Sequence, residues 1–319
     1  MTGEARRKVA TLRRAVTGLG AVGAQAAGLR SDLDLLRAQF GSLESREVTR
    51  LAPDKIREAE FRVFSQFGDD GIIQFLAQRV PIENDVFVEF GVEDYRESNT
   101  RFLLVHDNWR GLVLDAGHAM HEFLRSTGLA WRHDIEARTT FIDRDNINGV
   151  IRDADVEGDI GLLSIDLDGN DYWIFEAIEV VSPRILVVEY NSTFGAERAV
   201  TVPYDPGFVR GEKHWSWLYW GASLAAMTRL ANAKGLALVG GNSAGNNAFF
   251  VRRDLLGQIP EVSVAQAYRP GRFRESRDRE GELSYVGSLG ARLRLIEDLP
   301  LVDVETGHQA TVGGLVGRG

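Results

Sequence analysis

Carboxylate and amide side chains follow two apolar stretches in the middle of this chain. Asp166 and Asp168 leave the first stretch, and Glu189 and Asn191 leave the second. Residues i and i+2 of an extended segment share a face, so Asp166 and Asp168 would project together. Like charges this close need a cation, a proton or solvent between them, and hard cations prefer oxygen ligands. These residues are therefore a candidate cation site.

Two earlier apolar stretches end in the same way. Glu89 and Gly91 close the first, and Asp115 closes the next. Buried parallel strands read as apolar runs, and ligands of open α/β sheets lie beyond their carboxyl ends. Gly91 would let a ligand approach the backbone, and Asp115 would accept hydrogen bonds from ribose hydroxyls. A third, less regular element is predicted over 129–134, with 139–142 as a second candidate stretch, and Asp134 would close it near a bound base. One surface turn explains any single acid, but acids at several strand ends indicate a common site.

The elements that must position these side chains alternate between strand and helix patterns. Four apolar strands are followed by an amphipathic helix over 221–235 and by two β runs, 236–239 and 248–251, that form a hairpin. This order predicts a doubly wound α/β sheet. The connection over 192–223 is long and rich in aromatic residues, which is typical of a lid or binding loop, although core packing or a subunit contact explains each aromatic equally well.

Composition limits the classes of function. The 319 residues are 44% hydrophobic, enough for a full core and about two structural units. A net charge of -9 disfavours nucleic acid as a partner, because phosphate binding draws on basic residues. With no cysteine, disulfides, thiolate zinc sites and cysteine nucleophiles are excluded. No apolar run approaches the ~20 residues of a membrane span, and the N-terminus is too charged for a signal peptide. We expect a cytoplasmic protein.

The sequence predicts a separate helical segment over residues 1–51. Apolar residues recur at spacings of three and four through Leu29, Leu33, Leu36, Phe40 and Leu43. This heptad-like seam predicts either an oligomerisation helix or a helix that lies on its own domain. Interior glycines, each costing about 1 kcal/mol in a helix, favour a break or a packed segment. The glycines concerned are Gly18, Gly20, Gly23 and Gly28.

The order of these motifs resembles a known family. FVEFGV with SNT, GLVLDA, LLSIDLDGNDYWIFEAI, ILVVEYN and the closing GLALVGGNSAGNNAFFVRR together resemble class I S-adenosylmethionine-dependent methyltransferases, in particular the FkbM-like and related sugar or natural-product O-methyltransferases. The resemblance covers roughly residues 61–253. It implies a Rossmann-like, mostly parallel sheet with a C-terminal antiparallel hairpin, preceded here by the N-terminal helical segment. The chain departs from the usual E-x-G-x-G pattern, with Glu93 in place of the second glycine.

The resemblance also implies where the methyl donor, S-adenosylmethionine, would bind. Glu89 and Gly91 would face its methionine part, Asp115 its ribose and Asp134 its adenine. The stretch SQFGDDG adds Gln66. The expected cofactor-binding residues are Gln66, Glu89, Gly91, Asn99, Thr100, Asp115, Ala116, Asp134 and Asp166.

Methyl transfer to a hydroxyl of a sugar, glycan or glycosylated natural product is the implied reaction. A hydroxyl needs a base or a cation to become a nucleophile. The resemblance implies magnesium held by Asp166, Asp168, Glu189 and Asn191, and the candidate catalytic residues are Asp168, Asp171 and His214.

The expected organisation is a coiled-coil-like oligomerisation segment (1–51), a methyltransferase domain (52–260) and a C-terminal extension (261–319), in a homo-oligomer. Two other classes stay open. One is another nucleotide-using enzyme, which would need a glycine-rich phosphate loop that the sequence does not show. The other is a non-catalytic assembly protein that self-associates through its N-terminal helix, with a donor pocket filled by side chains.

Overall fold

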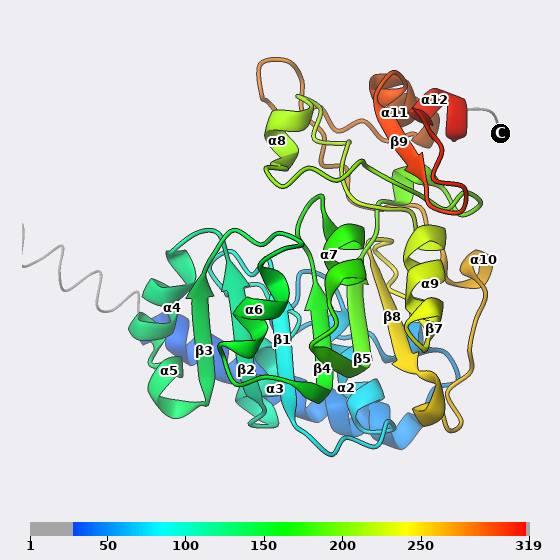
Figure 1. The fold of residues 1–319 in the computed structure, drawn as a ribbon. Coiled ribbons are helices and arrows are strands. Elements are labelled where there is room, and N and C mark those ends of the chain that lie inside the picture. The colour runs from blue at the N-terminus through cyan, green and yellow to red at the C-terminus, as the bar shows by residue number, and fades with distance from the viewer. Residues whose placement is uncertain (1–27, 317–319) are drawn as a thin grey trace, which may run out of the picture.

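A central seven-stranded sheet forms the main body of the protein (Figure 1). The computed structural model describes residues 28–316. The strand order is β3-β2-β1-β4-β5-β8-β7, with β8 antiparallel to both of its neighbours and the other pairs parallel. This confirms the predicted fold, a mostly parallel, Rossmann-like sheet that ends in an antiparallel hairpin. The strands are β1 (Val86–Phe90), β2 (Arg110–Asp115), β3 (Ile135–Thr139), β4 (Gly158–Ile165), β5 (Val181–Glu189), β7 (Leu236–Gly241) and β8 (Asn247–Arg252).

Helices cover both faces of the sheet, because successive residues of each strand point to opposite faces and the residues on both faces are apolar. In β1, Val88 and Phe90 belong to one buried cluster and Phe87 to the other. The first cluster packs under α6 (Ile147–Arg152), α7 (Asp171–Ala177), α9 (Leu224–Ala233) and α10 (Val264–Ala267). The second packs under α2 (Asp69–Ala77), α3 (Arg101–His106), α4 (Ala119–Thr127), α5 (Leu129–Arg132) and the 3₁₀ turn η1 (Ile56–Ala59). As predicted, α9 ends before Gly235, which has a positive φ of 81°.

A smaller unit, which we call the cap (residues 194–220 and 270–316), lies over the carboxyl ends of the strands (Figure 1). Its sheet pairs β9 with both β6 and β10, and its core joins aromatic residues of the long connection, such as Phe194 and Trp220, to C-terminal residues such as Ile296. Most aromatics of the connection are thus core residues. The bounds are η2 (Ser192–Phe194), β6 (Val200–Thr201), α8 (Arg210–Lys213), η3 (Arg253–Leu255), α11 (Leu289–Ile296), β9 (Pro300–Asp303), β10 (Gln309–Thr311) and α12 (Val312–Leu315).

The N-terminal helix spans 28–51 and lies along the side of the molecule that carries α2 and α3 (Figure 1, blue). Ser45 donates a hydrogen bond of 3.0 Å to Gln74, and Asp34 accepts one of 2.6 Å from Arg101. One face of this helix therefore lies on its own domain. Residues 1–27, including Gly18, Gly20 and Gly23, lie outside the described residues. Between residues 28 and 316 no helix is both long and apolar enough to cross a membrane.

Candidate active site

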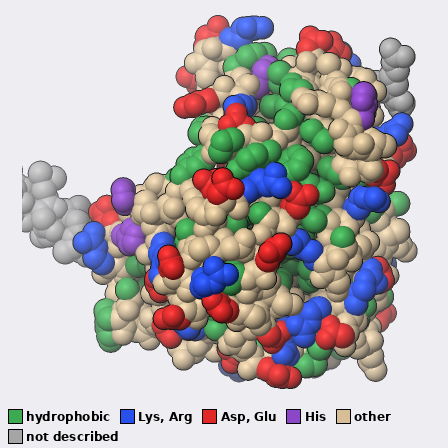
Figure 2. Space-filling view, viewed as in Figure 1, with side chains coloured by type: hydrophobic (Ala, Val, Ile, Leu, Met, Phe, Trp, Pro, Cys, Tyr) green, Lys and Arg blue, Asp and Glu red, His purple; other side chains and the backbone are tan. Residues whose placement is uncertain are grey.

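A cavity of about 1060 Å³ lies between the carboxyl ends of the strands and the cap. Figure 2 shows hydrophobic side chains gathered where these two parts meet, with acidic and basic groups beside them. Acidic side chains outnumber basic ones in the wall of the cavity. The lining acids are Glu89, Glu93, Asp94, Glu97, Asp115, Asp166, Asp168, Glu189 and Glu275, and the lining bases are Arg96, Arg210, Arg274 and Arg277.

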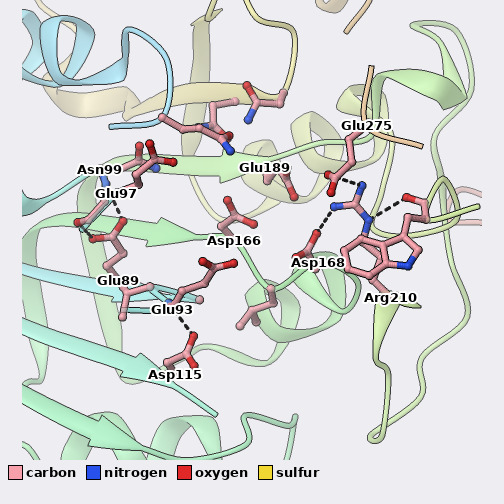
Figure 3. A pocket seen from close by; sticks show the side chains of 18 of the residues that line it. Glu89, Glu93, Glu97, Asn99, Asp115, Asp166, Asp168, Glu189, Arg210 and Glu275 are labelled. Atoms are coloured by element: carbon pink, nitrogen blue, oxygen red, sulfur yellow. Dashed lines mark hydrogen bonds and ion pairs between the residues drawn. The ribbon is translucent and has the colours of Figure 1, made fainter. Parts of the chain in front are cut away.

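Three of these acids form a tight cluster at the ends of β4 and β5 (Figure 3). One oxygen each of Asp166, Asp168 and Glu189 lies within 4.8 Å of the others. Burial, together with the neighbouring carboxylates, raises the pKa of both Asp166 and Glu189 well above its usual range. Within residues 28–316, the buried Oε2 of Glu189 has no hydrogen-bond partner. The cluster is therefore suited to hold a proton or a cation.

Asp168 reaches this cluster through a turn, and not through an extended segment as the i, i+2 spacing suggested. Strand β4 ends at Ile165, and Asp168 adopts a positive φ of 52°. Glu93 and Trp217, which also line the cavity, have positive φ values of 48° and 60°. Such backbone strain concentrates at functional sites.

Arg210 of the cap is a site residue that sequence reasoning missed. Its guanidinium donates to Asp168 at 2.6 Å and to the carbonyl of Trp217 at 2.8 Å, and lies 3.3 Å from Glu275 (Figure 3). Asp168 and Arg210 are 42 residues apart in the chain. Only the folded cap brings them together, and an isolated arginine in an aromatic-rich connection carries no sequence signal for such a pair.

Glu89 closes the turn between β1 and α3. Its carboxylate accepts hydrogen bonds from the Ser98 hydroxyl at 2.6 Å and from the amides of Asn99 at 2.8 Å and Thr100 at 3.3 Å. Burial raises the pKa of Glu89. Thr100 is buried beneath the cavity wall, so its predicted cofactor contact is wrong: it holds Glu89 instead. Asn99 and Gln66 line the cavity.

Asp115 ends β2 at the cavity wall, next to Ala116. Its two carboxylate oxygens accept backbone amides of Glu93 at 2.9 Å and Gly117 at 2.6 Å. The side chain is half-buried, and each oxygen keeps a further lone pair for a ligand hydroxyl. Asp115 ends its strand as predicted, and its contact with a ribose stays a prediction.

Gly91 lines the cavity, but its missing side chain serves the protein backbone. It has a positive φ of 73°, and a Cβ atom there would lie 1.5 Å from the carbonyl oxygen of Asp166. The glycine therefore lets the turn after β1 pass directly beside the end of β4. Protein backbone takes up the space that the sequence suggested for a ligand.

Asn191, Asp171 and His214 do not line the cavity, which corrects their predicted roles. Asn191 donates to the carbonyls of Leu218 and Trp220, both at 3.0 Å, and its oxygen accepts the amide of Thr193, so no lone amide oxygen faces a cation. Its side chain turns into the cap because β5 already ends at Glu189.

Asp171 is fully buried under the turn that carries Asp168. It accepts the amides of Leu167 at 2.7 Å and Gly169 at 3.0 Å, and burial raises its pKa to about 6. His214 lies 2.7 Å from the Ser216 hydroxyl through Nδ1, and burial lowers its pKa. Both side chains hold loops and do not reach the cavity.

Asp134 lies just before the amino end of β3, whereas the cavity lies at the carboxyl ends of the strands, so the predicted adenine contact is wrong. The stretch before it folds as helix α5, and β3 starts after it, at Ile135. Its side chain is 79% exposed and 3.9 Å from Arg110. At the carboxyl end of β3, Thr140, Phe141 and Ile142 line the cavity instead.

The buried acids predict an unusual dependence of stability on pH. Burial raises the pKa of Asp69, whose Oδ1 accepts from Asn242 at 2.9 Å, to about 7. In the folded state Asp69 stays protonated at pH values above its unfolded pKa of about 3.9. Its contribution to stability is therefore fully present below pH 3.9 and is lost as the pH rises towards 7. We expect the free energy of unfolding to decrease from pH 5 to 7 by up to about 1.4 kcal/mol per unit for this group.

Urea unfolding of the wild type, Asp69→Asn and Asp134→Asn at pH 5, 6 and 7 measures this slope. Asp69→Asn should flatten it, whereas the exposed control Asp134→Asn should keep the slope of the wild type. An identical slope in Asp69→Asn would show that Asp69 ionises freely in the folded state.

The chain is only distantly similar to proteins of known structure. No family model matches the chain, and no curated protein matches it. Among solved structures, it is similar to an O-methyltransferase family protein from Burkholderia thailandensis (13% identity, 67% of this chain and 58% of that one, TM-score 0.36). It is also similar to an O-methyltransferase from Bacillus cereus solved with SAH (15%, 65% and 88%, TM-score 0.39). A third is an S-adenosylmethionine-dependent methyltransferase from Clostridium acetobutylicum (10%, 57% and 89%, TM-score 0.37). With overlap this partial, the function has to be inferred from the chain's own site.

Proposed function

We propose that this protein binds S-adenosylmethionine in the cavity and transfers its methyl group to a hydroxyl of a sugar, glycan or glycosylated natural product. The observation that carries the proposal is the excess of carboxylates, nine against four arginines, in a cavity at the strand ends of a methyltransferase-type sheet. The donor carries a cationic sulfonium and an ammonium group. An acidic wall attracts such a ligand and repels phosphates.

The turn after β1 supports a donor without phosphates. Dinucleotide enzymes place a pyrophosphate on the amides at the start of the first helix. Here Glu89 already accepts the amides of Asn99 and Thr100 at the start of α3. A pyrophosphate would meet a carboxylate at that place, which disfavours the alternative of another nucleotide-using enzyme.

The size of the cavity favours an enzyme over a non-catalytic assembly protein. An assembly protein of this fold would have a donor pocket filled by side chains, whereas this cavity measures about 1060 Å³. Ligand sites typically enclose about 300–1,000 Å³. The space is therefore sufficient for a donor together with part of an acceptor.

The donor would lie across the ends of β2, β1 and β4 in our proposal. Asp115 would accept hydrogen bonds from the ribose, and Phe141 and Ile142 would contact the adenine. The methyl group would then face the cluster of Asp166 and Glu189, under the cap. Trp217 of the cap also lines the cavity, with the guanidinium of Arg277 4.4 Å from the centre of its ring.

In the transfer, a lone pair of the acceptor oxygen forms a bond to the methyl carbon. The bond from that carbon to sulfur breaks, its electron pair stays on the sulfur, and S-adenosylhomocysteine leaves. The hydroxyl proton must pass to a base, and we propose Asp168 or Glu189 of the acidic cluster for this role.

We also propose a magnesium site made by Asp166, Asp168 and Glu189. Three converging carboxylates, with a Glu189 oxygen that has no hydrogen-bond partner among residues 28–316, fit a hard cation. Asn191 no longer belongs to the set. A cation there would supply positive charge that favours the deprotonated acceptor hydroxyl. Arg210 supplies part of that charge from the cap side.

Replacing Asp115 by alanine should weaken donor binding tenfold or more, because hydrogen bonds to a charged group contribute about 1.5–3 kcal/mol each. Calorimetric titration with S-adenosylmethionine and S-adenosylhomocysteine measures the change. The matched control is Asp134→Ala, an aspartate at the amino end of β3 and away from the cavity, which should bind like the wild type. Unchanged affinity in Asp115→Ala would reject this placement of the ribose, and absence of binding by the wild type would reject the proposed function.

A further inference from the structure

The outward face of the N-terminal helix (28–51) is a stripe of large apolar side chains. Leu29, Leu33 and Phe40 are 60%, 55% and 65% exposed, and Leu36 and Leu43 are about half exposed. Isolated apolar residues are normal on a protein surface, but a continuous stripe along one helix marks an interaction site. We call these five residues the seam.

The seam has the spacing of a coiled coil. Its residues follow one another at intervals of four, three, four and three, which are the a and d positions of successive heptads. Three residues of this helix are buried against its own domain, all at b and f positions: Gly41, Ser45 and Val48. Asp34 and Ala38, also at b and f positions, are half-buried, as is Ser42 at a c position. The b and f positions lie on the opposite side of the helix from a and d, so the domain holds the helix with its seam pointing straight outward.

We propose that two copies of this chain associate through the seam, as a parallel two-stranded coiled coil. A seam of a and d residues is complementary to itself, because each side chain packs between four residues of a facing helix of the same kind. The two domains would lie on opposite sides of the helix pair, since each occupies the far side of its own helix. Nothing in this association depends on the chemistry proposed for the cavity.

Charge favours a second copy over a membrane surface. Helices that lie on anionic membranes carry a polar face rich in lysine and arginine. Here the helix has four arginines and four acids, so its net charge is zero, and its polar face is partly covered by its own domain. The charged residues are Arg30, Asp32, Asp34, Arg37, Glu44, Arg46, Glu47 and Arg50.

The flanking charges also select the parallel arrangement. Asp32 stands at a g position and Arg37 at the following e position, and a parallel pair brings g of one helix beside the next e of the other. Asp32 of each copy would therefore face Arg37 of the second copy, twice by symmetry. The Arg37 side chain is 63% exposed, with its nearest carboxylate, Asp34, at 3.8 Å, so it is free to turn towards the seam.

The decisive experiment compares two neighbouring, exposed leucines. Leu36 belongs to the seam, whereas Leu35 is 59% exposed but lies off it, at a c position. The wild type should have twice the chain mass of 35.3 kDa by light scattering. Leu36→Arg should raise the dissociation constant of the dimer roughly 100-fold or more, since each dimer loses two buried leucines. Leu35→Arg should stay dimeric.

Urea unfolding of both variants shows whether they fold, which we expect because both side chains are exposed in the single chain. A monomeric wild type, or a dimer that survives in Leu36→Arg, would overturn the proposal. So would a loss of the dimer in both variants, because the contact would then not follow the seam.

Single cysteines test the parallel register, and the chain is suited to them because it contains none. Under mild oxidation Leu33→Cys should form an intermolecular disulfide within the dimer, because the two a residues of one layer face each other. Leu35→Cys, as the matched control, should remain reduced. A Leu33→Cys dimer that does not cross-link would overturn the parallel arrangement.

Discussion

Gly91→Ala should lower the free energy of unfolding by about 4 kcal/mol. The added Cβ would lie 1.5 Å from the carbonyl oxygen of Asp166, so the turn after β1 and the end of β4 must move apart. The left-handed φ of 73° adds the usual cost of a side chain in that region. Because Asp166 starts the acidic cluster, the same movement should also weaken donor binding.

Gly158→Ala is the matched control for this variant. Gly158 has nearly the same φ, 70°, but among the described residues no atom lies within 4 Å of a Cβ placed there. It should therefore lose only the conformational cost, about 1 kcal/mol. Urea unfolding of both variants separates the steric contribution from the conformational one. Equal losses would show that the backbone of Asp166 yields to the new atom at little cost.

Asp168→Asn should slow methyl transfer by about 100-fold or more, and so should a chelator added to the wild type. Asp168→Asn removes a carboxylate that would hold the cation and accept a proton, whereas the chelator removes the cation itself. Donor affinity should change little, since the ribose contact is at Asp115. The assay measures S-adenosylhomocysteine formed with a panel of sugars and glycosylated acceptors. His214→Ala, outside the cavity, is the control and should retain full activity.

A second measurement of the cation does not need an acceptor. Ionisation of Asp166 and Glu189 is opposed by burial and mutual repulsion, which raise the pKa of both. A bound cation relieves this repulsion, so magnesium should raise the midpoint of thermal unfolding at pH 8. The effect should be weaker at pH 5, where protons compete with the cation, and absent in Asp168→Asn.

Full activity in excess chelator, with no effect of magnesium on unfolding, would contradict the cation. The cluster would then be relieved by a proton shared between Asp166 and Glu189, and proton transfer from the acceptor would fall to a carboxylate alone. Activity lost in Asp168→Asn but unaffected by chelation would assign Asp168 the role of the base.

The sheet and its acidic edge could be predicted from the sequence because their signals are local. Each buried strand is a short apolar run, and the residue that ends the run is read directly from the chain. Since parallel strands have their carboxyl ends at one edge, the sequence alone predicts that Asp115, Asp166 and Glu189 lie together. All three line the same cavity in the folded protein.

Residues without such a local signal were placed wrongly or missed. A short stretch such as 129–134 has no period that distinguishes strand from helix. It folds as α5, which puts Asp134 at the amino end of β3, away from the cavity. Asn191 follows the end of β5, and His214 follows the short helix α8 inside the cap, and at both places the chain direction depends on packing. Arg210 and Glu275 meet at the cavity only because the cap closes over it.

The N-terminal helix shows the same division between local pattern and tertiary packing. Its heptad spacing is a property of the sequence alone, since it depends only on which residues are apolar and how far apart they stand. That spacing does not say whether the apolar stripe faces the protein or the solvent. The structure decides this, because Ser45 on the opposite side bonds to Gln74 of α2, Val48 joins the buried cluster under α2, and the seam is left outside. Either face of the helix can pack against the domain, and only the shape of the folded domain's surface determines which face is buried.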